Sequence, residues 1–205
     1  MKISAYICFL LIFSLAGLNK TEAQVCTGSL GDAVVNINFG AGTSLPPALP
    51  ASTTTYNYVT TDCPNDGNYT IISSTNNCFN GSWHNLPEDH TPNDVNGYMM
   101  LVNASLTPSD FYVDTIKALC ANTTYEFTAW VVNVLKTSSC QPNPTRPNLV
   151  FTIETTTGTV LGTYSTGNLI ETASPVWNQY GLFFTTPAGT PNVVIRIRNN
   201  GPGGC

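Results

Sequence analysis

The sequence predicts an all-β protein, a two-sheet antiparallel β-sandwich for which a jelly roll is the favoured strand order. Charged residues make up only 9% of the chain, and Thr, Asn, Ser, Gly and Pro take their place. This composition is typical of extracellular β-proteins rather than of disordered chains. Apolar and polar residues alternate in short runs, and turn residues separate these runs about every ten positions, the spacing of a sandwich.

The short runs predict about eight to ten strands, and no segment has the period of a helix. The first strand is expected where Val35, Ile37 and Phe39 alternate with asparagines, before the turn at Gly40. The other strands are expected at residues 56–59, 69–72, 98–102, 110–113, 125–135, 149–154, 160–164, 176–186 and 193–197.

The most apolar of these runs covers residues 125–135, so we expect a central, buried strand there. Trp130 lies inside this run and is expected in the core. Trp177 follows a proline at the start of a strand, so it is expected in the core or at its rim.

Residues 1–23 are predicted to be a secretory signal peptide, because an apolar run follows Lys2 and small residues precede the cleavage site. A transmembrane anchor is the alternative, but the apolar run is shorter than the ~20 residues that a span needs. Residues 24–205 then form one exported domain, extracellular or on the outer cell surface, with no membrane insertion after cleavage. The chain ends on a turn at residues 201–205, so we expect this domain to lack its last strand and downstream domains to follow.

The charge balance argues against anionic partners. Five basic and eleven acidic residues follow residue 23, which gives a net charge of about −6. Neither nucleic acid nor an anionic membrane surface is attracted to such a chain.

Six cysteines follow the signal peptide, and an even number in an exported chain indicates disulfides. Fifteen pairings are open. Cys63–Cys78 and Cys120–Cys140 would close short, turn-rich loops, which leaves Cys26–Cys205 to join the two ends. A zinc site is the alternative, but no Cys-x-x-Cys spacing occurs.

Motifs for catalysis are missing from the sequence, so we predict that the protein is not an enzyme. There is no Gly-x-Ser-x-Gly elbow, no His-Glu-x-x-His motif and no glycine-rich phosphate loop. His84 and His90 lie in a loop without an evident third zinc ligand. Glu126 and Glu154 lie within expected strands, but both are expected to face solvent rather than each other across a cleft.

Three stretches resemble known jelly-roll domains. LCANTTYEFTAWVV, at residues 119–132, is similar to a strand of jelly-roll carbohydrate-binding modules, and WNQYGLFFTTP followed by NVVIRIRNN resembles their later strands. DHTPNDVNGYMMLVNAS, at residues 89–105, resembles a signature of MAM domains, which are related to galactose-binding folds and often adhesive. The whole mature chain, over nearly all of residues 25–205, also resembles the N-terminal module of large secreted Bacteroidetes surface proteins of the type IX secretion kind.

The resemblance implies a structural calcium ion, and otherwise no cofactor. Calcium prefers oxygen ligands. Asn38 and Asp89 are the residues that would supply them. The alternative is that Asp89 only caps a turn by accepting backbone hydrogen bonds.

The resemblance also implies a non-catalytic recognition module that binds carbohydrate or a cell-surface ligand, or mediates adhesion. A sugar site needs an exposed aromatic ring with polar neighbours, and Trp83 with His84 and Asn85 fits best, with Tyr56 as a further candidate. Trp83 could instead cover one end of the sandwich. A structural spacer domain of a large adhesin is the alternative function, and part of a secreted hydrolase is the third.

Overall fold

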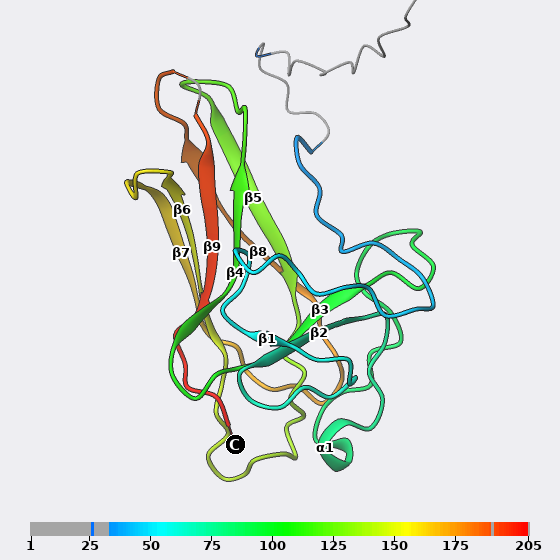
Figure 1. Cartoon of the computed structure of the whole chain (residues 1–205). Helices are drawn as coiled ribbons and strands as arrows, with labels where there is room; N and C mark the ends of the chain where they lie inside the picture. The colour runs from blue at the N-terminus through cyan, green and yellow to red at the C-terminus, as the bar shows by residue number, and fades with distance from the viewer. Residues whose placement is uncertain (1–25, 27–32, 190, 205) are drawn as a thin grey trace, which may run out of the picture.

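The computed structural model describes Cys26, residues 33–189 and residues 191–204 (Figure 1). The predicted signal peptide, residues 1–23, therefore lies outside the described residues. Within them the chain forms one short helix, α1 (Cys78–Gly81), and the strands β1 (Asn57–Tyr58), β2 (Asn68–Ile72), β3 (Met99–Asn103), β4 (Ser109–Ile116), β5 (Thr124–Val131), β6 (Asn148–Thr155), β7 (Val160–Asn168), β8 (Asn178–Thr185) and β9 (Val193–Asn199). The predicted all-β class is confirmed.

The strands form three sheets in the described part of the chain, in the orders β1-β2-β3, β4-β9-β6-β7 and β5-β8. Every pairing is antiparallel except the short parallel contact between β1 and β2. Figure 1 shows β4, β9, β6 and β7 grouped together, with β5 beside them and β8 passing behind.

The main core lies between the four-stranded sheet and the β5-β8 pair. Ile153 of β6 and Ile195 of β9 pack against Phe184 of β8, and the partly buried Phe127 of β5 joins them. Strands β6 and β9 bury alternate residues, as period-two runs with one buried face do. These two sheets therefore form the predicted antiparallel sandwich.

The chain crosses from one sheet of the sandwich to the other between β4 and β5, and crosses back between β8 and β9. Strand β4 pairs with β9 in one sheet, and the strands next to them in sequence, β5 and β8, pair in the other. A long strand pair folded across two sheets produces such pairing. The jelly roll itself stays a prediction.

A second core lies on the β1-β2-β3 sheet. Ile72 of β2 and Leu101 of β3 pack with Trp83 and Leu135. The Cys63–Cys78 disulfide, with a Cα–Cα distance of 5.3 Å, lies beside them and confirms that predicted pair. This core anchors the loop that follows Trp83.

The other two predicted disulfides are wrong. Cys120 pairs with Cys26, at a Cα–Cα distance of 5.5 Å and across 94 residues of sequence. Cys120 precedes β5 and Cys140 follows it, and an eight-residue strand spans ~26 Å, far beyond the reach of a disulfide. With Cys26 engaged, the predicted Cys26–Cys205 bridge is excluded, and Cys205 lies outside the described residues.

The strand predicted at residues 35–39 is absent from the described structure, and Val35 and Ile37 are 46% and 43% exposed. Phe39 and Gly40 adopt left-handed conformations, with φ of 55° and 82°. The Asn38 side-chain oxygen accepts a hydrogen bond from the Gly40 N–H at 3.1 Å. This turn separates residues 35–38 from the single antiparallel bridge that the next residues make.

Candidate functional site: an exposed aromatic face on the β5-β8 sheet

The structure buries most of the residues predicted to bind sugar. Trp83, His84 and Tyr56 are only 8%, 2% and 6% exposed. Asn85 is exposed, but its side-chain oxygen accepts the backbone N–H of Asn77 at 2.9 Å. These four residues therefore do not form an aromatic surface for a sugar.

Trp83 and His84 are buried because the chain pairs with the segment after β5 at this point. His84 N–H donates to the Val134 carbonyl, and Trp83 forms a bridge with Leu135. The ring of Trp83 packs on Phe79 at a centroid distance of 4.7 Å. Trp83 therefore packs in the core on the β1-β2-β3 sheet.

His84 is a structural residue. Its Nε2 lies 3.2 Å from the Thr172 hydroxyl. Burial, and then the nearby Lys136 ammonium, lower the pKa of His84, so the ring is neutral at pH 7. A buried neutral ring bonded to a hydroxyl stabilises the fold rather than serving as a ligand site.

Asn38 and Asp89, the predicted calcium ligands, have different surroundings. The Asn38 side-chain oxygen is bonded to Gly40, as described above. Asp89 accepts the Thr91 hydroxyl through Oδ2, and its buried Oδ1 has no hydrogen-bond partner beside Gly97. Among the described residues, no three His, Cys, Asp or Glu side chains are arranged to hold a metal. Calcium binding at Asp89 stays a prediction.

The expected burial of Trp130 is wrong. Trp130 is 46% exposed, because no other described sheet covers one face of the β5-β8 pair. We call this face the platform. It consists of Thr124, Glu126, Thr128 and Trp130 from β5, with Gln179, Gly181, Phe183 and Thr185 from β8.

Phe183 is the most exposed aromatic residue of the platform, at 70%. It lies opposite Glu126 in the antiparallel register, whereas Trp130 lies opposite Gln179. Opposed side chains are ~5 Å apart, and four residues along a strand span ~13 Å. Two aromatic rings therefore stand ~13 Å apart along the strands, each beside a side chain that forms hydrogen bonds.

Loop residues hold Trp130 in place. The His90 ring stacks on it at a centroid distance of 3.8 Å and an interplanar angle of 15°. Trp177 packs against the edge of His90 at 5.8 Å. The structure thus brings His90 and Trp177 to one end of the platform, and aromatic packing fixes the orientation of the Trp130 ring.

The platform carries one carboxylate, Glu126, and no basic side chain. The arginines of the sandwich are engaged elsewhere: Arg146 with Glu171 at 2.8 Å, and Arg196 with Asp110 and Glu154 at 2.7 Å each. The ion pair with Arg146 lowers the pKa of Glu171 to about 2. These cations are therefore not available to an anionic ligand on the platform.

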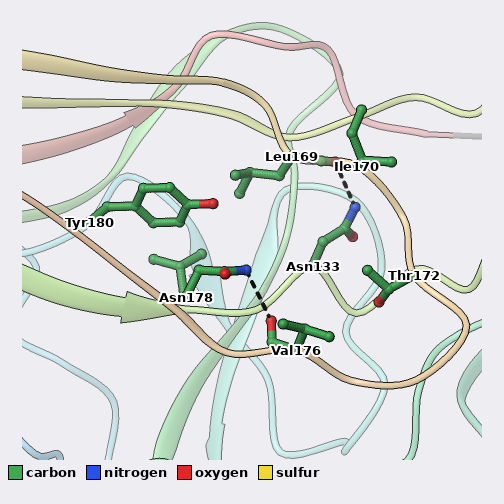
Figure 2. Close-up of a pocket in the computed structure, with 8 residues that line it drawn as sticks. Asn133, Leu169, Ile170, Thr172, Val176, Asn178 and Tyr180 are labelled. Atoms are coloured by element: carbon green, nitrogen blue, oxygen red, sulfur yellow. Dashed lines mark hydrogen bonds between the residues drawn. The ribbon is translucent and has the colours of Figure 1, made fainter.

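A small pocket lies at the end of the same sheet, among residues of the opposite face (Figure 2). Asn133 donates to the Leu169 carbonyl at 2.9 Å, and Asn178 donates to the Val176 carbonyl at 3.4 Å. The pocket volume is about 40 Å³, which suits a water molecule or two rather than a sugar ring. Tyr180 and Thr172 complete its polar lining.

The platform could have been found in the sequence. Thr124, Glu126 and Thr128 alternate with Tyr125 and Phe127. This alternation extends to position 130 and assigns Trp130 to the polar face. The apolar residues that follow Thr128 concealed the pattern.

Comparison with known proteins identifies no relative: no family model, no curated protein and no solved structure matches the chain. The described residues include no helix with the length and apolar character needed to cross a membrane. The function is therefore inferred from the geometry of the platform.

Proposed function

We propose that the chain is a non-catalytic recognition module that binds carbohydrate on the platform. The observation that carries this proposal is the pair of exposed rings, Trp130 and Phe183, on one face of two paired strands. Exposed apolar groups that gather on one face of a soluble protein often mark an interaction site. Strands also hold their side chains more rigidly than loops do.

A carbohydrate suits this surface because it has both apolar and polar parts. The C–H face of a pyranose ring can stack on Phe183 or on the part of Trp130 that His90 leaves open, while its hydroxyls bond to polar neighbours. Glu126 and Gln179 lie directly opposite the two rings, and Thr128 lies between them along β5. These groups supply both acceptors and donors.

Binding without catalysis is favoured by the single carboxylate of the platform. Glycoside hydrolysis generally requires two carboxyl groups ~5–9.5 Å apart. Glu126 has no acidic neighbour on the platform. The same charge pattern favours uncharged glycans, because an anionic glycan would meet Glu126 and a chain with excess acidic residues.

An extracellular location is part of the proposal. The Cys63–Cys78 and Cys26–Cys120 disulfides are typical of oxidising compartments. We place the module in a larger secreted or cell-surface protein, with a jelly-roll fold and an adhesive or glycan-binding role.

A glycan array tests both the ligand class and its charge. We expect the folded chain to bind uncharged glycans, and to bind carboxylated or sulfated glycans of the same backbone at least about tenfold more weakly. The array is run with calcium and with EDTA, because Asp89 remains the candidate calcium ligand. A preference for acidic glycans contradicts the proposal, and binding to none favours the structural spacer.

A further inference from the structure

A cleft of about 850 Å³ opens between β3 and β5. Residues 99–104 line it without a break, as do residues 125–135. Side chains of a strand alternate between two faces, so an unbroken run is expected where the backbone edge of a strand borders the cleft. The cleft is therefore a slot between two strand edges.

Both edges lack a strand partner in the described part of the chain. Strand β3 pairs only with β2, and β5 pairs only with β8. Unpaired edges in a sheet bind further strands readily, because their N–H and C=O groups remain available.

The volume of the slot is sufficient for a short strand. One strand residue in a sandwich occupies roughly 160 Å³, from a rise of ~3.3 Å, a strand spacing of ~4.8 Å and a sheet spacing of ~10 Å. The cleft also reaches core residues of β6 and β9, such as Phe151 and Ile195, and it is large enough to take a short strand.

A segment of the same chain, residues 33–39, already borders this slot. Residues 33–39 line the cleft as a third unbroken run. Their apolar residues alternate like a strand, yet Val35 and Ile37 remain nearly half exposed. Burial in the slot would remove these side chains from water.

One end of this segment is tied to β3. Ala41 forms an antiparallel bridge with Gly97, with hydrogen bonds from Tyr98 N to Gly40 O at 2.8 Å and from Gly42 N to Asn96 O at 3.0 Å. If the same ladder continued, residues 35–39 would lie opposite residues 99–103, which are β3.

Cys26 and Ala41, which flank this segment in the sequence, lie near opposite ends of β5. Cys26 is bonded to Cys120, just before β5 begins. Gly97, the partner of Ala41, lies against the Asp89 carboxylate, next to the His90 ring that stacks on Trp130 near the end of β5. The segment therefore runs parallel to β5 and antiparallel to β3.

We infer that the cleft is a strand-acceptor site and that its occupant is residues 35–39 of the same chain. Insertion joins two separate sheets into one, with the order β1-β2-β3, then residues 35–39, then β5-β8. The left-handed turn at Phe39 and Gly40 must rearrange for this to happen, since it interrupts the ladder beyond Ala41. In the structure, residues 33–39 border the cleft without being paired to β3 or β5.

Amide hydrogen exchange on the full chain, read by NMR, tests this inference. We expect the amides of residues 35–38 to exchange at least about 100-fold more slowly than unprotected amides. The Ile37→Asp variant should lose this protection, because its carboxylate would be buried in the slot. Asn36→Asp adds the same charge on the opposite face, so its amides at residues 35–38 should stay protected. Slow exchange of the β6 and β9 amides shows that each variant is folded.

Unprotected amides at residues 35–38 of the unmodified chain would overturn the inference, whatever the variants do. Equal loss of protection in both variants would overturn it as well. Protection that appears only in a dimer, by size-exclusion chromatography at several concentrations, would assign the slot to a second copy instead.

Discussion

Replacing Phe151 with alanine is expected to lower the free energy of unfolding by about 3–5 kcal/mol. Phe151 of β6 is 0% exposed. Its ring packs against Phe127 of β5 at 5.8 Å and Tyr164 of β7 at 6.3 Å, so it joins both sheets of the sandwich. Removal leaves a cavity where the two sheets meet. Denaturant unfolding followed by fluorescence measures the change.

The matched control is Phe183→Ala, which removes the same ring from the exposed platform. Since Phe183 is 70% exposed, this change is expected to alter the free energy of unfolding by less than about 1 kcal/mol. Similar losses for both variants would contradict the assignment of the inner and outer faces of the sandwich.

Replacing Trp130 with alanine is expected to weaken glycan binding at least about 30-fold, or about 2 kcal/mol, the effect of losing a central aromatic contact. Because the ring is 46% exposed, the fold should be retained. Calorimetric titration with the best uncharged glycan from the array measures the loss of affinity.

Phe79→Ala is the control for this binding experiment. Phe79 is also an exposed aromatic residue, at 39%, but it belongs to α1 and packs on Trp83 rather than on a platform residue. We expect its glycan affinity to match that of the unmodified chain. Loss of binding in Phe79→Ala but not in Trp130→Ala would return the site to the neighbourhood of Trp83.

Much of the fold could be predicted because one face of most strands is buried. In β6, buried Leu149, Phe151 and Ile153 alternate with more exposed neighbours, and this period of two is visible in the sequence. Residues 35–39 show the same alternation, which predicted a strand there. The alternation gives no sign of the left-handed turn at Phe39 and Gly40, which interrupts the pairing.

The site was harder to predict, because exposure depends on which strands find partners. Trp130 has apolar neighbours, yet it lies on the surface because no other described sheet covers the outer face of the β5-β8 pair. Trp83 has polar neighbours, yet its pairing with Leu135 buries it. Cys120 likewise pairs with Cys26, 94 residues away, and the short loop between Cys120 and Cys140 gave no sign of this partner.

The most direct test of the proposed site uses the indole N–H groups of Trp83, Trp130 and Trp177 as reporters. We would record ¹⁵N–¹H spectra while titrating the uncharged glycan that binds most tightly on the array. The platform predicts that the Trp130 signal shifts with saturation, while the signal of the buried Trp83 stays in place. A saturating shift of Trp83 with Trp130 unchanged would contradict the site.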